Sequence, residues 1–277
     1  MSKWDLYRGE YSASKNLAID EYLLKETTKN DNKVVRIYDF EKPSVILARN
    51  ESFEDIKNIE SNYEYTRRDS GGSVIFCDEN ALFYSVIMPN KENKFPERLH
   101  RDFFGPKIAK VLERSGVEKK KIGVGEHFSV RINGKTVSGN SQRKKKGGIL
   151  YHGVLALESW DVEKLDQIIE LREKEGETEY DFIEKLPGLY DHSQKSIEKE
   201  DVASYLIQEF TEGDYKKTEL SGRDKKEISK LVDEKYGNQE WIKNGKLDTE
   251  SLKKNQGFCF VDWTDEWKED VIKQGFY

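Results

Sequence analysis

The sequence predicts an α+β fold in which mixed or antiparallel sheets pack with helices. Three observations support this class. Apolar residues recur at helical spacing over residues 12–29, and short apolar or alternating runs then dominate residues 34–157. From residue 162 the helical spacing returns. Because the strands cluster together between helical segments, this pattern favours an α+β fold with the helices to one side of the sheet.

In the first third of the chain, a helix should run from Ser12 to about Lys29, since Ser12 or Ser14 can cap its start. Extended runs and turn residues then alternate. They predict strands at residues 34–38 and 44–48 around Pro43, a short helix at 53–61, strands at 63–67 and 73–76, and a strand at 81–88 closed by Pro89.

The middle of the chain contains the strongest hairpin signal, Asn133-Gly134 between two alternating runs. A helix should precede it and a basic loop should follow its second strand. The spacing predicts a helix at residues 102–115, strands at 128–132 and 136–139, a loop at 144–148, a strand at 149–157, and helices at 162–172, 197–211 and 226–236.

Composition excludes several classes of function. A net charge of −6 argues against a general nucleic-acid binder. The two cysteines, Cys77 and Cys259, match no metal-ligand spacing and cannot form a disulfide framework, so we expect no metal held by the protein and a reducing cytoplasmic setting. No stretch reaches the length of about 20 apolar residues that a membrane span needs.

The run from Arg67 to Ser73 is the most informative stretch for function. Two arginines, a serine and two adjacent glycines stand directly before an apolar strand pattern. Glycines let backbone N–H groups approach an anion closely, and arginine offers a planar fork of donors. The run is therefore typical of a phosphate- or carboxylate-binding turn, although a Gly-Gly pair between strands is often only a turn.

Four ordered segments resemble the lipoate–protein ligase family, which belongs to the biotin/lipoate ligase superfamily. They are an N-terminal helix, the arginine–glycine turn, and two later signatures: Asn16–Glu21, Arg67–Gly72, Gly134–Arg143 and Tyr151–Leu155. The resemblance implies a ligase-type catalytic domain over residues 1–211 and a short charged extension over residues 212–277. That extension is short for a complete second domain.

The resemblance also implies an activity. Such ligases use ATP and Mg²⁺ to convert lipoate, or a related acid such as octanoate, into acyl-AMP, and then acylate a lysine of a carrier protein. The residues implied at catalytic positions are Lys135 and Thr136. Those implied to bind the acyl group and the nucleotide are Arg68, Ser70, Gly71, Gly72, Ser73, Cys77, Ala81, Ser138, Gly139 and His152.

This chain departs from the family pattern at several of these positions. Ser73 stands where the family has a third glycine, and Cys77-Asp78 and Asn80-Ala81 replace its His-Asp and Gly-Asn pairs. The family's catalytic lysine aligns with Thr136, while Lys135 lies one residue earlier. In a strand that shift turns a side chain to the other face, so Lys135 would need a β-bulge to substitute.

Three functions stay open on these residues. One is the ATP-dependent ligase, with Lys135 or Arg143 as the substitute cation. The second is an octanoyl or lipoyl acyltransferase that needs no ATP; such enzymes of the superfamily use a cysteine, but theirs does not align with Cys77, which also reads as a small buried hydrophobe. The third is a non-catalytic lipoyl-binding protein.

The partners implied are proteins. The basic runs at residues 119–121 and 143–146 suit an acidic lipoyl carrier domain of the E2 or glycine-cleavage H type, although a solvated loop is their simpler reading. A separate small accessory subunit would compensate for the short C-terminal extension. No nucleic acid or membrane partner is expected.

Overall fold

The computed structural model describes residues 4–57, 62–125, 127–160, 167–168, 173–174, 177–178 and 187–245. The described residues up to Gly245 form one compact unit, and residues 246–277 lie outside the described ranges. No helix in the described ranges is both long enough and apolar enough to cross a bilayer.

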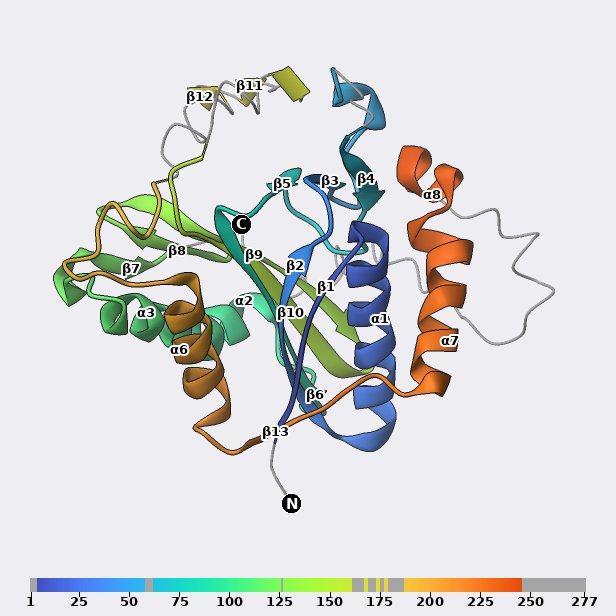
Figure 1. Ribbon diagram of the computed structural model, residues 1–277, viewed down its shortest axis with the longest axis horizontal. Coiled ribbons are helices and arrows are strands. Elements are labelled where there is room, and N and C mark those ends of the chain that lie inside the picture. The colour runs from blue at the N-terminus through green and yellow to red at the C-terminus, as the bar shows by residue number, and fades with distance from the viewer. Residues whose placement is uncertain are drawn as a thin grey trace, which may run out of the picture. The chain divides into compact units, whose positions relative to one another are not determined.

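The main unit is built on a mixed eight-stranded sheet (Figure 1). The first three strands run parallel, and each later neighbour is antiparallel. Their order across the sheet is β13 (Tyr215–Lys217), β1 (Trp4–Tyr11), β2 (Lys33–Phe40), β6 (Ala81–Asn90), β10 (Gly147–Ala156), β9 (Lys135–Lys145), β8 (Ser129–Ile132) and β7 (Ile122–Val124).

The prediction of a mixed sheet packed with helices is confirmed. Strand β1 was not predicted, because only Trp4 and Leu6 mark its buried face.

Helices cover both faces of this sheet, so the prediction that they lie to one side of it is wrong. Helix α1 (Ala13–Asn30) begins as predicted, with the Ser12 hydroxyl accepting a hydrogen bond from the backbone N–H of Lys15. On the other face, α3 (Gly105–Arg114) and α6 (Lys199–Thr211) enclose the main hydrophobic core. Helix α6 begins after Glu198, which forms a capping box with Asp201, and so starts two residues later than predicted. Short helical segments complete this side: α2 (Pro96–Leu99), η2 (His100–Phe104) and η3 (Lys119–Lys121).

A second, three-stranded sheet carries the arginine–glycine turn. Its order is β4 (Glu64–Arg67), β3 (Ser44–Leu47) and β5 (Ile75–Cys77).

The helix expected at residues 53–61 is only a 3₁₀ turn, η1 (Phe53–Asp55), and residues 58–61 lie outside the described ranges. Most of the helix expected at 162–172 also lies outside them. Two further short strands, β11 (Glu173–Lys174) and β12 (Glu177–Thr178), pair with each other.

Two strands run further than their sequences predict. The expected loop at residues 144–148 is wrong: β9 continues to Lys145, and Gly147, with φ +87°, turns the chain into β10. Beyond Gly139 strand β9 pairs only with β10, and edge positions tolerate charged side chains. Likewise β6 continues through Pro89, which lies past the last pair with β2, so its missing N–H breaks no ladder on that side.

The chain returns to α1 after residue 221. Helix α7 (Gly222–Leu231), the π-helical turn η4 (Val232–Tyr236) and α8 (Gln239–Asn244) pack along α1 and β4 (Figure 1). Residues 222–245, here called the C-terminal strap, therefore belong to the same compact unit as the arginine–glycine turn. The functional division between residues 1–211 and 212–277 remains a prediction.

Candidate active site

The arginine–glycine turn is held from within by Arg68. Its guanidinium donates to the carbonyl oxygens of Gly71 at 2.8 Å, Ser73 at 2.7 Å and Ile46 at 3.2 Å. Burial lowers the pKa of Arg68 to about 10, against the opposing effect of the Glu51 carboxylate. The guanidinium expected to bind a ligand is thus occupied by the carbonyls of its own turn.

The two glycines and Ser73 form the outer part of the turn. Gly72 has φ +101°, and a Cβ there would lie 2.9 Å from the Arg68 guanidinium, so both its conformation and its space require glycine. Glu51 closes the turn from the other side, because its carboxylate accepts the backbone N–H groups of Val74 at 2.6 Å and Ala48 at 2.8 Å. Gly71, Gly72 and Ser73 are exposed.

A small cavity lies where this turn meets the sheet and helix α1. Its volume is about 20 Å³, the space of one water molecule. Its walls include both apolar and ionic side chains, and it brings together three of the predicted residues, Arg68, Ser70 and His152. The remaining wall residues are Leu17, Asp20, Glu21, Leu24, Asp69, Arg143, Lys145, Leu150 and Tyr236.

His152 joins the turn to the sheet and to α1. Its Nε2 lies 2.7 Å from the Ser70 hydroxyl, and its Nδ1 lies 3.3 Å from the Asp20 carboxylate. Asp20 is in turn paired with the buried Arg36, which also contacts Asn16. These polar groups therefore satisfy one another in a site from which water is largely excluded.

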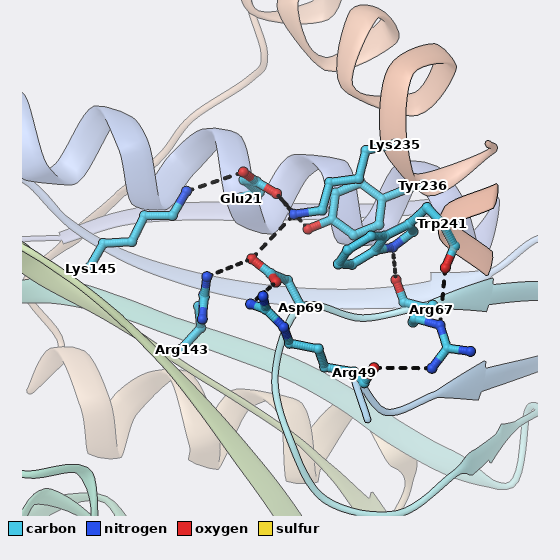
Figure 2. Close-up of polar contacts among 9 residues, drawn as sticks. All are labelled: Glu21, Arg49, Arg67, Asp69, Arg143, Lys145, Lys235, Tyr236 and Trp241. Carbon is cyan, nitrogen blue, oxygen red and sulfur yellow. Dashed lines mark hydrogen bonds and ion pairs between the residues drawn. The ribbon is translucent and has the colours of Figure 1, made fainter. Parts of the chain in front are cut away.

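Two carboxylates beside the cavity are surrounded by cations (Figure 2). Asp69 contacts Arg49 at 2.9 Å, Arg143 at 3.1 Å and Lys235 at 3.2 Å. Glu21 contacts Lys145 at 3.1 Å and Lys235 at 2.7 Å, and it accepts the Tyr236 hydroxyl at 2.7 Å. Lys235 bridges both carboxylates, so the C-terminal strap is ion-paired directly to the turn and to α1.

The electrostatics of this charge cluster are dominated by those cations. Burial alone would raise the pKa of Glu21, but the charges of Lys235 and Lys145 and the hydrogen bonds from Lys235 and Tyr236 more than offset it. The pKa of Glu21 therefore lies well below its usual range. Because each carboxylate lining the cavity is already ion-paired with protein cations, the described residues do not fit a protein-held Mg²⁺ ion.

The β9 residues divide between the two faces of the sheet. Gly139 lies on the cavity face with Ser141, whose hydroxyl donates to the Gly71 carbonyl at 2.9 Å. Ser138 points to the opposite face, where its hydroxyl lies 3.2 Å from that of Tyr84 in the core. Ser138 is therefore separated from the cavity by the sheet itself.

A β-bulge is present at Val137, because Thr136 and Ser138 pair with consecutive residues of β8. It does not bring Lys135 to the cavity. Thr136 pairs with Arg131 and shares the face of Gly139, whereas Lys135 pairs with the core residue Ile132 and is exposed at the hairpin. The register thus places the threonine, and not the lysine, on the face where the family pattern has a lysine.

Two further predicted residues lie away from the cavity. Cys77 is fully buried in β5, and burial raises the pKa of its thiol despite the nearby Arg68. Ala81 begins β6, on the cavity face but four residues before Ser85, whose hydroxyl donates to Asp20. Neither Cys77 nor Ala81 lines the cavity.

Several site residues carried no sequence motif that identified them. Asp69 lies inside the turn, where its sequence context is typical of an ordinary loop residue. Lys235 lies in a polar helical segment more than 160 residues from Asp69 in the sequence. A signal did exist for Asp20: Asn16 and Asp20 are four residues apart on the apolar face of a helix, a position where polar side chains need buried partners.

Comparisons with known proteins identify the family and support the fold. Residues 12–211 match the model of the lipoyl protein ligase A/B catalytic domain. The octanoyltransferase LipM of Clostridioides difficile is 30% identical over 88% of this chain and 99% of its own length. The lipoate-protein ligase LplJ of Bacillus subtilis is 26% identical, over 82% of this chain and 69% of its own. A bipartite lipoate protein ligase of Thermoplasma acidophilum has the same fold, with a TM-score of 0.75. Its structure was solved in a study of an archaeal lipoylation system with an E2 lipoyl domain. The match has 20% sequence identity and covers 89% of this chain and 98% of that one.

Proposed function

The chain belongs to the lipoyl protein ligase A/B catalytic domain family, and we propose that it is an acyltransferase that moves an octanoyl or similar medium-chain acyl group from a thioester donor to a lysine of a lipoyl carrier domain, without ATP. The observation that carries this proposal is the register of β9. Lys135 faces away from the cavity, and Thr136 brings no charge to a developing phosphoryl anion.

The charges around the cavity support the same choice. Arg68 is bound to carbonyls, Arg143 and Lys235 contact Asp69, and Lys145 contacts Glu21. Among the described wall residues each cation thus already has a partner, so a triphosphate would have to break these contacts. A thioester is uncharged at its reacting carbonyl and makes no such demand. The full-length match to an octanoyltransferase agrees with this proposal.

An ATP-dependent lipoate or octanoate ligase is the second candidate, favoured by the match to LplJ. Mg²⁺ would then be carried by the ATP phosphates and water, since the cavity carboxylates are occupied. In that case Arg143, which lies on the cavity face, is better placed than Lys135 to meet a phosphoryl oxygen.

The test offers the purified chain two donors in parallel, octanoyl-acyl carrier protein without ATP, and free octanoate or lipoate with ATP and Mg²⁺. The acceptor is a lipoyl domain of the E2 type, and acylation is read from its intact mass. A lipoyl domain whose acceptor lysine is replaced by arginine is the control. We expect transfer from the thioester alone. Transfer only from a free acid with ATP would establish the ligase instead.

A further inference from the structure

Ser70, His152 and Asp20 form a row of hydrogen-bonded side chains from three distant parts of the chain. Ser70 comes from the arginine–glycine turn, His152 from β10 and Asp20 from α1. The Ser70 hydroxyl lies 2.7 Å from His152 Nε2, and His152 Nδ1 lies 3.3 Å from the Asp20 carboxylate. Their exposed fractions are 3%, 7% and 1%, so water competes little for these bonds.

The surroundings of Asp20 determine which ring nitrogen carries the proton. Arg36 and the Ser85 hydroxyl both bind the Asp20 carboxylate. Burial alone would raise the pKa of Asp20, but Arg36 and the bonds from His152 and Ser85 lower it, so the carboxylate is ionised. An ionised carboxylate only accepts hydrogen bonds, so Nδ1 carries a proton toward it. In the neutral ring Nε2 is then the acceptor, and the Ser70 hydroxyl donates to it.

This arrangement borders the small cavity described above. Ser70, His152 and Asp20 all line it, together with the apolar side chains of Leu17, Leu24 and Leu150. The Ser70 hydroxyl therefore lies next to an apolar wall as well as next to a histidine acceptor. The only cysteine in the described part of the chain, Cys77, is buried elsewhere and does not line the cavity.

We propose that Ser70 is the nucleophile that carries the acyl group as an oxygen ester, with His152 as its general base and Asp20 as the residue that positions the imidazole. This rests on the proposed function, because the donor is taken to be an acyl thioester. The recurrence of such serine, histidine and carboxylate rows on unrelated folds shows that geometry, not sequence order, defines them.

The two chemical steps balance with the groups named. In the first, the Ser70 oxygen attacks the thioester carbonyl, its proton passes to His152 Nε2, and the carbon–sulfur bond breaks as the leaving thiolate takes that proton. In the second, the neutral amine of the carrier lysine attacks the ester carbonyl. The carbon–oxygen bond breaks, and His152 transfers a proton from the amine to the Ser70 oxygen. The products are a thiol, an amide and the original enzyme.

The experiment incubates the purified chain with octanoyl-acyl carrier protein in the absence of an acceptor. Intact mass and peptide fragmentation then locate any adduct. We expect one octanoyl group on Ser70 that neutral hydroxylamine does not remove, as an oxygen ester requires. Ser70→Ala should abolish the adduct, and Ser70→Cys should form a thioester that neutral hydroxylamine does remove.

A matched control is Ser115→Ala, since Ser115 is equally buried but donates only to the Val111 carbonyl in α3. It should keep the adduct. Asp20→Asn tests positioning: kcat for transfer should fall on the order of 10²-fold or more with KM for the thioester unchanged, which a merely structural role would not produce. Circular dichroism confirms that each variant is folded.

The outcomes separate this proposal from the proposed function. Transfer to the carrier that Ser70→Ala leaves intact, or an adduct on any other residue, overturns the role of Ser70 while the transferase stands. Transfer that needs the Ser70 hydroxyl but never produces an ester on it also overturns the nucleophile. An ester on Ser70 without transfer to a lipoyl domain supports the nucleophile and refutes the transferase.

Discussion

Arg67 and Trp241 each bind the other's backbone. The Arg67 guanidinium Nε donates to the Trp241 carbonyl at 3.0 Å, and the Trp241 indole donates to the Arg67 carbonyl at 2.8 Å (Figure 2). The same guanidinium also donates to the carbonyls of Ile242 and Lys243 in the last turn of α8. The first arginine of the motif is thus a C-terminal cap for the strap, and only the second belongs to the turn.

Replacing Arg67 by methionine should therefore destabilise the protein. Several buried carbonyls of α8 and of residues 48–51 would lose a charged donor. We expect a loss of about 3 kcal/mol or more in the free energy of unfolding, and a fall in Tm on the order of 5–10 °C. Differential scanning calorimetry measures both. Arg101→Met is the control, since Arg101 is exposed and should change neither. An unchanged Tm in Arg67→Met would contradict the capping role.

Lys235→Met should lower the stability of the fold at neutral pH and make that stability less dependent on acid. The pKa of Glu21 is lower in the folded chain than its value of about 4.3 when unfolded, so the unfolded chain takes up the proton first. This stabilisation is present above the unfolded pKa and is lost as pH falls through the folded pKa. Without Lys235, whose charge lowers the pKa most, the folded pKa of Glu21 should lie closer to its unfolded value, so the two states differ less in the protons they bind. Stability measured by urea titration should then be lower than wild type at pH 7, but should fall less between pH 7 and pH 3.

Gly153→Ala should disturb the sheet next to His152. A Cβ at residue 153 would lie 2.0 Å from the Asn140 side-chain oxygen and 2.9 Å from the Gly139 carbonyl. Asn140 would have to abandon its bonds to Tyr84 and Phe128, which we expect to cost about 2 kcal/mol or more. Gly123→Ala provides the comparison, because nothing lies within 4 Å of its added Cβ. Equal effects of the two variants in chemical denaturation would be inconsistent with this packing.

Cys77 should be inert to thiol reagents in the folded protein. Burial keeps the thiol protonated and out of reach, and the thiolate is the reactive form. In a Cys259→Ser background, a thiol-reactive dye should label the chain only after guanidinium unfolding, when one equivalent reacts. Rapid labelling under native conditions would show that Cys77 is accessible and reopen its role as a nucleophile.

Local patterns were sufficient to predict most of the framework. The Ser12 cap, the Asn133-Gly134 turn and the apolar strands depend on neighbours within a few residues, and each formed as expected. The ends of β6 and β9 were mispredicted because Pro89 and the lysines normally stop a strand. A strand accepts proline or several lysines where the strand beside it has already ended. Where each neighbouring strand ends is known only once the sheet is assembled.

The site was less predictable for a related reason. The motifs located Ser70 and His152, but the hydrogen bonds of His152 also involve Asp20 in α1, whose partner Arg36 comes from strand β2. The role expected for Arg68 also differed, since its guanidinium faces the carbonyls of its own turn. The pairing of donors and acceptors across the sheets depends on the three-dimensional fold, and the spacing of residues along the sequence does not determine it.

The charge cluster is locally opposite in sign to the whole molecule. The chain carries a net charge of −6, yet in this cluster four cations surround two carboxylates. Under the proposed function, an acidic carrier domain is repelled by the net charge at long range and favoured by the positive excess close to the cavity. The balance between these two terms would then set the preferred orientation of the encounter, and added salt would weaken both.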